Sequence, residues 1–332
     1  MRDYLSRPES DKNKTDMNKI LVTGSTGFIG QRLCAVLQER GLSVREAVRN
    51  TSTVARDAVA VGAIDEQTNW APALKDVSVI IHLAGRAHVM HDDSADPLAA
   101  YRRVNVAGTS RLAQMAAAAG VRRLVFVSSI KVNGEATDEQ PFTEMDTPAP
   151  RDPYGISKWE AEEELKAIGR ETGLEIVVVR PSLVYGSGVK GNFLSLMRLV
   201  HKGIPLPVAG CDNRRSLLGL ENFVDFLATC VDHPASPGQT FVLSDGEDLS
   251  TSELIRHLAS AMGRPARLFS IPPAWLQLAA NLFGKSGVYQ RLCGSLRVDS
   301  SHARRVLGWV PPQTVDAGLV TAVRTFLQWS GE

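Results

Sequence analysis

Two short segments carry side chains that could move a proton. Tyr154 and Lys158 lie four positions apart, so in a helix they share one face and the ammonium can approach the phenol. A phenol has a pKa of about 10, and a neighbouring cation favours its ionised form. Ser129 ends the strand-like run that begins at Val125, and its hydroxyl could bond to the same substrate oxygen. Together the three side chains predict proton transfer at a substrate oxygen.

A glycine-rich loop lies far upstream, directly after the first apolar run. It reads Gly24-Ser-Thr-Gly-Phe-Ile-Gly30 and opens a helical segment. In such a loop one glycine permits the tight turn, one lets the backbone approach a pyrophosphate, and one allows close packing of helix on strand. The helix N-terminus then holds the anion. We therefore predict hydride transfer between a nicotinamide and a substrate carbon, with the dinucleotide contacting Gly24, Thr26, Gly27, Phe28, Ile29 and Gly30.

The end of the second strand candidate bears on the choice between NAD(H) and NADP(H). An acidic residue there binds the ribose hydroxyls, whereas an arginine accommodates a 2′-phosphate. The chain reads Val48-Arg49-Asn50, and Glu46 lies inside the strand. Because Arg49 can hold a phosphate through two charge-assisted hydrogen bonds, the sequence favours NADP(H), with NAD(H) as the alternative.

The elements that must position these residues alternate from Lys19 onwards. Short β-branched runs are followed by helical segments, which predicts an α/β fold with a doubly wound parallel sheet, the Rossmann arrangement. The strand candidates are Ile20–Thr23, Ser43–Val48, Val77–Leu83, Arg123–Ser128 and Glu175–Arg180. The helix candidates, each ending near a glycine, are Gly30–Arg40, Tyr101–Ala119 and Ser157–Thr172.

The expected domain boundaries follow from this pattern. Residues 1–16 are polar and lack an apolar run, so they are expected to form a disordered extension. Residues 17–180 are expected to form the dinucleotide-binding domain, with a returning segment at about 215–245. After Arg180 the alternation loosens, and residues 181–214 and 246–332 are assigned to a smaller C-terminal substrate-binding domain.

The composition is that of an ordinary folded chain. Hydrophobic residues make up 44% and charged residues 22%, and the net charge is +1. Basic and acidic residues are interspersed, so we expect neither nucleic acid nor an anionic membrane as a partner. The stretch Ala274–Phe283 is shorter than the ~20 residues of a membrane span. A cytoplasmic protein without a zinc site or a disulfide framework is expected, because no CxxC spacing joins Cys34, Cys211, Cys230 and Cys293.

Taken together, the motifs resemble the extended short-chain dehydrogenase/reductases of the NAD-dependent epimerase/dehydratase family, from about Lys19 to Trp309. The resemblance is supported by His82-Leu-Ala-Gly85, Asn105-Val-Ala-Gly-Thr109, Arg180-Pro-Ser-Leu-Val-Tyr-Gly186 and Leu307-Gly-Trp309. It implies that Ser129, Tyr154 and Lys158 form a catalytic triad. It also implies cofactor contacts at Leu83, Ala84, Gly85, Asn105, Tyr154, Lys158 and Pro181, with the segment Pro181–Val184 beside the nicotinamide.

Two departures from the family's pattern affect the expected contacts. Val61-Gly62-Ala63 stands where relatives often have an aspartate at the adenine, and Asp65 is a candidate substitute. Leu183 stands where many sugar-nucleotide members have asparagine before Val-Tyr-Gly. Substrate contacts at Leu183 are therefore expected to differ.

The resemblance further implies a nucleoside diphosphate sugar, here a UDP-sugar, as substrate and a homodimer as the assembly. A diphosphate needs cationic and amide donors. Arg215 resembles the phosphate-binding arginine, with Arg214 as the alternative, and Arg86 and His88 are candidates for the sugar pocket. The full set of candidate substrate-binding residues is Ser129, Asn192, Phe193, Arg215 and Arg291.

Within the family, short segments resemble reductases of bacterial polysaccharide assembly. The leading prediction is NADPH-dependent reduction of the 4-keto group of a UDP-4-keto-6-deoxy-N-acetylhexosamine in surface polysaccharide synthesis. The alternative is a UDP-sugar 4-epimerase with bound NAD, which uses the same triad. A dehydratase is disfavoured because Ile130 and Lys131 replace its acidic pair, and the complete triad disfavours a non-catalytic nucleotide sensor.

Overall fold

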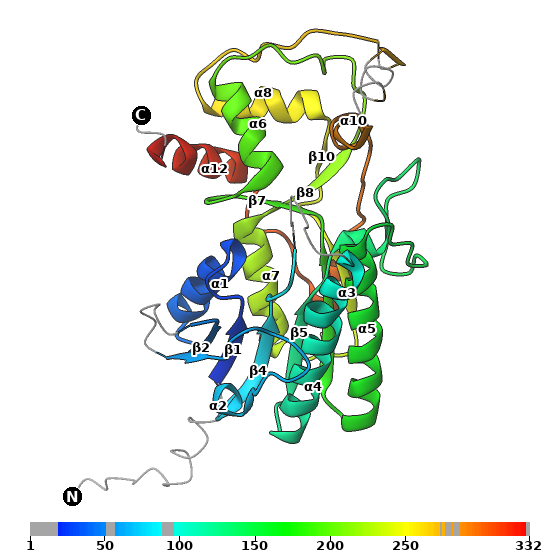
Figure 1. Ribbon diagram of the computed structural model, residues 1–332. Helices are drawn as coiled ribbons and strands as arrows, with labels where there is room; N and C mark the ends of the chain where they lie inside the picture. Colours follow the sequence, from blue (N-terminus) through cyan, green and yellow to red (C-terminus); the bar gives the residue numbers. More distant parts are fainter. Residues whose placement is uncertain are drawn as a thin grey trace, which may run out of the picture.

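The computed structural model describes residues 19–50, 57–87, 96–272, 274–275, 281 and 286–329. The extension expected over residues 1–16 and the candidate His88 lie outside these ranges. Seven parallel strands form one sheet in the order β3-β2-β1-β4-β5-β6-β9 (Figure 1). The strands are β1 (Lys19–Thr23), β2 (Val44–Val48), β3 (Ala58–Ala60), β4 (Val77–His82), β5 (Arg123–Val127), β6 (Glu175–Pro181) and β9 (Thr240–Leu243).

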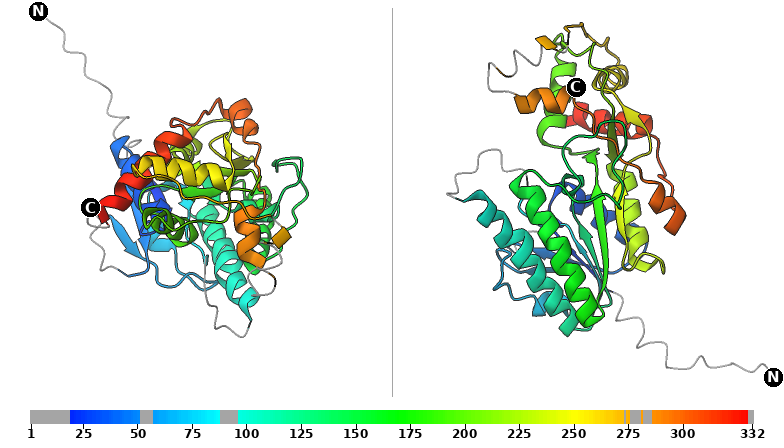
Figure 2. Two further views of the ribbon diagram at one scale, coloured as in Figure 1. Left: turned by 90° about the horizontal axis from the view of Figure 1, so that it is seen from above. Right: turned by 90° about the vertical axis from the view of Figure 1, so that its right-hand side faces the viewer.

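Helices cover both faces of this sheet, so the strands are apolar on both sides. Ile20 and Val79 face one core, and Leu21 and Ile80 face the other, because successive side chains alternate across a strand. The first core also receives α1 (Phe28–Glu39), α7 (Leu220–Asp232) and α11 (Ser301–Leu307). The second receives α2 (Ala71–Leu74), α4 (Gly108–Ala118) and α5 (Pro153–Thr172) (Figure 2). The prediction of a doubly wound parallel sheet is confirmed.

A smaller sheet of order β10-β8-β7 lies beyond the carboxyl ends of the large one (Figure 1). Its strands are β7 (Leu183–Tyr185), β8 (Arg215–Gly219) and β10 (Asp248–Leu249). Together with α6 (Gly191–His201), α8 (Thr251–Ala261), α10 (Ser286–Cys293) and α12 (Val315–Trp329), they form what we call the outer lobe. Side chains from α6, α8 and α12 build its own apolar core around Tyr185.

Two helices differ from the sequence expectation, and both differences affect the site. Helix α5 begins at Pro153 because the Asp152 carboxylate accepts a hydrogen bond from the Gly155 N–H at 2.7 Å, and proline suits a first helical position. Tyr154 therefore lies in the first turn of α5.

The helix expected over Tyr101–Ala119 consists of three pieces: α3 (Pro97–Arg102), a π-helical turn η2 (Arg103–Ala107) and α4. Strands β3 and β9, each very short, were absent from the strand candidates.

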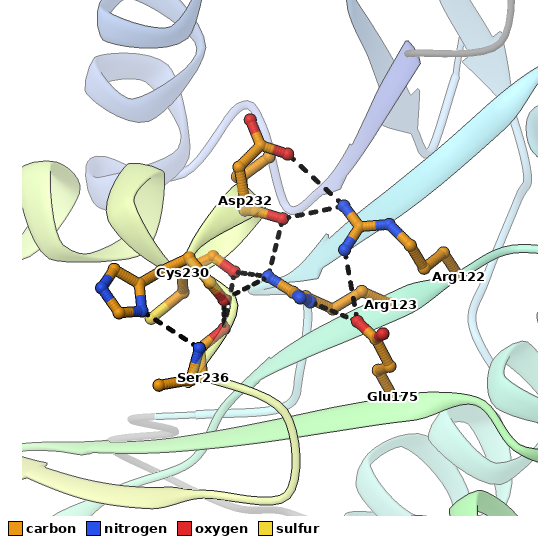
Figure 3. A network of polar contacts seen from close by, with 9 residues as sticks. Arg122, Arg123, Glu175, Cys230, Asp232 and Ser236 are labelled. Carbon is orange, nitrogen blue, oxygen red and sulfur yellow. Dashed lines mark hydrogen bonds and ion pairs between the residues drawn. The ribbon is translucent and has the colours of Figure 1, made fainter. Parts of the chain in front are cut away.

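At the amino end of the large sheet a buried arginine caps the C-terminal end of a helix. Arg123 is only 2% exposed, and it donates to the carbonyls of Cys230 at 2.8 Å and Val231 at 2.9 Å, at the end of α7 (Figure 3). Its Nε donates to Glu175 at 2.7 Å. Cations are favourable near the carbonyl end of a helix, where the last C=O groups have no partner within the helix. Arg123 thus anchors α7 to β5.

One cysteine pair contradicts the sequence expectation. Cys211 and Cys293, 82 residues apart, form a disulfide with Cα atoms 5.2 Å from each other. Sequence spacing could not predict it, because the pairing depends on how the outer lobe folds. Cys34 and Cys230 are buried thiols. Among the described residues, each helix is too short or too polar to cross a bilayer.

Candidate active site

The glycine loop packs against the end of β4. Gly24 has φ +69°, and a Cβ placed there would come within 2.9 Å of the Ala84 nitrogen. A Cβ at Gly30 would come within 2.2 Å of the Gly24 carbonyl oxygen. Helix α1 starts at Phe28 after Gly27, without a side-chain cap, so its first N–H groups point into the loop. Strand β1 lies between β2 and β4, where the sheet order reverses, which is where ligands bind in such folds.

A buried chain of hydrogen bonds fixes the neighbouring strand ends. The Thr23 hydroxyl lies 2.7 Å from Nδ1 of His82, and Nε2 of His82 lies 3.0 Å from the Thr109 hydroxyl. Thr23 also accepts a bond from the Ala84 N–H at 3.1 Å. Burial lowers the pKa of His82 to about 3, so the imidazole is neutral. This chain holds the Leu83–Gly85 backbone beside the glycine loop.

Asn105 links that backbone to α5. Its Oδ1 accepts from the Arg86 N–H at 2.8 Å, and its Nδ2 donates to the Arg86 carbonyl at 3.1 Å and to the Ser157 hydroxyl at 2.9 Å. A Cβ at Gly85 would lie 3.0 Å from Asn105 Oδ1 and 3.4 Å from Lys158 Nζ. Glycine at this position therefore lets the side chains of Asn105 and Lys158 lie close to the backbone.

The three predicted catalytic side chains converge at this edge. Ser129 follows β5 and caps the short 3₁₀ turn η3 (Ile130–Val132), and its side chain hydrogen-bonds with that of Tyr154. Lys158 is 3% exposed and donates to the Val127 carbonyl at 2.8 Å. The rings of Tyr101 and Tyr154 lie 6.1 Å apart. The structure thus brings the two predicted segments together, although the catalytic roles stay a prediction.

The ionisation of these groups differs from the simple sequence argument. Burial raises the pKa of Tyr154 to about 12, and the hydrogen bond with Ser129 opposes this shift without cancelling it. Burial also lowers the pKa of Lys158 to about 8, and the negative charge of Glu162 acts in the opposite direction. At pH 7 the tyrosine is therefore a neutral phenol and the lysine is predominantly a cation. Lys158 by itself does not make the phenolate favourable, because the loss of water around the buried Tyr154 has the largest effect on its pKa.

An ion pair behind the site was not anticipated. Glu162, fully buried on α5, accepts a bond from the Ser128 hydroxyl at 2.5 Å and a two-point contact from Arg180. Arg180 also donates to Asn133 Oδ1 at 3.0 Å. The pair joins α5 to β6 and to Ser128, the residue before Ser129. Its sequence signal was the glutamate four positions after Lys158, on the same helical face.

The remaining cofactor candidates occupy different settings. Arg49 is exposed at the end of β2, and Pro181 is buried at the end of β6. Asp65, the possible adenine contact, is paired with Arg103 at 2.9 Å. None of these contacts selects between NAD and NADP.

The substrate candidates divide into accessible and enclosed side chains. Asn192 is exposed in the first turn of α6, whereas Phe193 is only 4% exposed and stacks on Tyr185 in the lobe core. Arg215 starts β8 and donates to the Gly294 carbonyl at 2.9 Å, and Arg214 is engaged with Glu253 at 2.9 Å. Phe193 packs in the lobe core, and its contact with a ligand stays a prediction. The side chain of Arg291 lies outside the described part of the chain.

The sugar-pocket candidate Arg86 and the departure at Leu183 also have clear positions. The Arg86 guanidinium lies 5.4 Å from the centre of the Tyr101 ring. The Tyr101 ring in turn lies beside the ring of Tyr154. Leu183, where relatives often have asparagine, is 46% exposed on β7. Arg86 is therefore connected to Tyr154 through the ring of Tyr101.

A nucleotide-dependent oxidoreductase is the class of protein that this fold and site define. The chain belongs to the NAD dependent epimerase/dehydratase family, whose model matches residues 20–244. The UDP-glucose 4-epimerase of Vibrio cholerae is 47% identical over 315 residues, which are 93% of this chain and 95% of that protein.

Solved structures agree with this family. A short-chain dehydrogenase/reductase superfamily protein from Agrobacterium tumefaciens with bound NAD is 25% identical, with a TM-score of 0.74 over 94% of this chain and 98% of that one. MoeE5 in complex with UDP-glucuronic acid and NAD is 26% identical, with a TM-score of 0.74 over 94% of this chain and 99% of that one.

These comparisons overturn the leading functional prediction. The 4-ketoreductase of surface polysaccharide synthesis is wrong, because a relative at 47% identity over nearly the whole chain is a 4-epimerase. The triad serves both reactions, so the reductase argument depended on Arg49 and on short loop similarities. The identity along nearly the whole chain is stronger evidence about the reaction than Arg49 or the short loop similarities.

Proposed function

We propose that the protein is a UDP-sugar 4-epimerase that interconverts UDP-glucose and UDP-galactose with NAD held throughout the cycle. The observation that carries this proposal is the 47% identity to the Vibrio cholerae UDP-glucose 4-epimerase. The proposal is also supported by the proximity of Ser129, Tyr154 and Lys158 at the carboxyl edge of the large sheet. An epimerase of this family needs all three side chains at the reacting sugar oxygen.

The residues around the loop fit a dinucleotide. Side chains at Gly24, Gly30 or Gly85 would collide with backbone or with the groups of the site, so a narrow space is kept beside the uncapped start of α1. When bound there, NAD would accept a hydride from C4 of the sugar and return it to the opposite face. Both solved structures compared above contain NAD. The preference for NADP(H) drawn from Arg49 is untested and is not part of this proposal, which takes NAD.

The chain's own groups account for the proton. As the C4 hydroxyl becomes a carbonyl, its proton passes to the oxygen of Tyr154, and it returns when the hydroxyl reforms. Ser129 can bond to the same sugar oxygen. Because burial raises the pKa of Tyr154 to about 12, the protonated form is the resting form. The positive charges of Lys158 and of the oxidised nicotinamide favour the phenolate that the first step requires.

We assign substrate binding to residues 181–214 and 246–332, with the dinucleotide held by residues 17–180 and the segment 215–245. Arg215 supports this assignment because it lies on β8 at the border of the two parts, where a diphosphate would need a cation. The homodimer and the cytoplasmic location stay predictions.

The proposal is tested with purified protein and no added cofactor. We expect UDP-galactose to be converted to UDP-glucose, and acid denaturation to release about one NAD for each chain. Conversion that requires added NADPH, or a chain that releases no NAD and has no activity when NAD is supplied, would contradict the proposal.

A further inference from the structure

A cation that has no role in the proposed mechanism lies beside the proton-transfer groups. Lys131 belongs to the short turn η3, which Ser129 caps. Its backbone N–H donates to the Ser129 hydroxyl at 3.3 Å. Its ammonium forms an ion pair with the carboxylate of Asp152. Lys131 therefore contacts both a member of the predicted triad and the residue that caps α5.

The two oxygens of Asp152 have different partners. Oδ1 accepts a hydrogen bond from the Gly155 N–H at 2.7 Å and so begins α5, whereas Oδ2 binds the Lys131 ammonium. The backbones of η3 and α5 are also close, because a Cβ at Gly155 would lie 2.9 Å from the Lys131 carbonyl oxygen. The first turn of α5, which carries Tyr154, is therefore held against η3 by backbone packing and by the ion pair.

The charge of Asp152 opposes ionisation of the tyrosine. Burial is the largest cause of the raised pKa of Tyr154; the bond with Ser129 lowers this pKa, and the charge of Asp152 raises it further. A cation next to that carboxylate acts in the opposite direction, since it favours the phenolate. Burial by itself would lower the pKa of Lys131, but its bond to Asp152 and the charges of Asp152 and Glu135 raise it overall. Lys131 is therefore a cation at neutral pH.

Other titratable or charged groups face Tyr154 from the elements around it. Lys158 lies one turn further along α5, the Tyr101 ring approaches from α3, and the Arg86 guanidinium lies over the far ring of Tyr101. Lys131 differs from these groups because its charge lies directly on the carboxylate that opposes the phenolate.

We propose that Lys131 is a positioning residue for proton transfer, because its ammonium compensates the Asp152 carboxylate beside Tyr154 and holds the start of α5 against η3. The inference deepens the proposed function and rests on it, since the proton comes from the C4 hydroxyl of the sugar. When that hydroxyl becomes a carbonyl, Tyr154 must accept the proton, so a charge that disfavours its phenolate slows the step. Lys131 acts on this step through Asp152.

The test is the pH dependence of UDP-galactose epimerisation by the holoenzyme. K131M leaves Asp152 uncompensated, so the acidic limb of the kcat profile should move up by about half a pH unit. Below this limb kcat should fall about threefold. D152N keeps an N-cap side chain and leaves Lys131 uncompensated, so the limb should move down. The limb of K131M/D152N should lie close to the parent's, and K131R should retain the parent's limb.

A second measurement needs no turnover. NMR of protein labelled with ¹³C at the tyrosine Cζ follows the ionisation of Tyr154 with NAD bound, and Tyr154→Phe assigns the resonance. The midpoint should move in the same directions as the kinetic limb. K166M is the matched control, because Lys166 pairs with Glu163 about three turns along α5 from Tyr154, and its loss should leave both the limb and the midpoint in place.

The proposal is overturned if K131M leaves the midpoint unchanged, or if adding D152N to K131M does not restore it. It is also overturned if K131M lowers NAD content and turnover equally at every pH, because a merely structural role would have this effect. If the parent epimerises no UDP-galactose, the proposed function fails, and the NMR titration still decides the role of Lys131.

Discussion

Each end of the seven-stranded sheet buries an arginine at 2% exposure, but the two arginines have different neighbours. At the amino end, Arg123 closes α7 and pairs with Glu175 (Figure 3). At the carboxyl end, Arg180 pairs with Glu162, which shares a helical face with Lys158 and binds the residue before Ser129. The comparison shows that a buried charge by itself does not mark a site. What distinguishes the carboxyl end is that its ion pair adjoins the predicted triad: Glu162 accepts a bond from Ser128, and its charge raises the pKa of Lys158.

The largest effect is expected from breaking either ion pair. Glu162→Gln leaves Arg180 buried without a countercharge, and Arg123→Met removes the donor to the α7 carbonyls and to Glu175. Removing one partner of the fully buried Glu162–Arg180 pair costs about 3–5 kcal/mol of unfolding free energy. Glu175 is 32% exposed and keeps Arg122, so Arg123→Met should lose about 1–3 kcal/mol, mainly from the unsatisfied α7 carbonyls. Urea denaturation of the two variants should show losses of these sizes.

The two variants should differ in catalysis. Glu162 raises the pKa of Lys158, so Glu162→Gln should shift the alkaline limb of the pH–rate profile to lower pH, whereas Arg123→Met should leave it in place. If both variants shift the profile equally, the two ends are equivalent and the comparison fails.

Removal of the Tyr154 hydroxyl should give the next largest effect. Tyr154→Phe deletes the proton carrier and should lower turnover by ~10²-fold, which corresponds to about 2.7 kcal/mol of barrier. NAD content after purification should be unchanged. Tyr101→Phe is the control, because its ring contact with Tyr154 persists, and steady-state assays should show turnover within a few-fold of the parent. Near-normal turnover in Tyr154→Phe would remove the tyrosine from the mechanism.

A smaller effect concerns pH and the buried imidazole. The pKa of His82 is lowered from 6.5 to about 3 by burial, so between these values the unfolded chain binds a proton that the folded chain does not. Its contribution to stability is therefore lost as pH falls from 6.5 towards 3, by about 1.4 kcal/mol per pH unit. His82→Gln should flatten this slope in denaturation series at several pH values.

The smallest effect is expected at the rim of the amino-end network. Asp232 is 77% exposed and lies 3.4 Å from Arg122 (Figure 3). Because an exposed ion pair contributes about 0–1 kcal/mol, Asp232→Asn should change the denaturation midpoint little. If Asp232→Asn lost as much unfolding free energy as Arg123→Met, solvent would not be screening the ion pair of Asp232 and Arg122.

Local patterns predicted the parts of the molecule that depend on short stretches of chain. The glycine loop follows β1 as expected, and Tyr154 and Lys158 share a helix because four residues make about one turn. The disulfide of Cys211 and Cys293 could not be predicted, because neither cysteine carries a signal of the fold that joins them. Glu162 carried a signal, because it lies four positions after Lys158, but its pairing with Arg180 was missed because Arg180 lies on a separate strand, β6.

The reaction was predicted less well than the residues that perform it. Reductase and epimerase share the triad, so the triad cannot discriminate between them. The positions of side chains in the outer lobe depend on contacts between distant segments, such as the hydrogen bond from Arg215 to the Gly294 carbonyl. Short motifs do not report such contacts, whereas similarity along the whole chain does.

The π-helical turn η2 sets the angular phase of the helix that borders the site. In an α-helix each residue turns about 100°, so positions four apart drift by about 40° and positions eight apart by about 80°. Tyr101, Asn105 and Thr109 are spaced in this way, and they contact the ring of Tyr154, the Ser157 hydroxyl and the imidazole of His82. The wider turn between Arg103 and Ala107 reduces the rotation per residue. It therefore keeps in line three contacts that a regular α-helix would spread over about a quarter of its circumference.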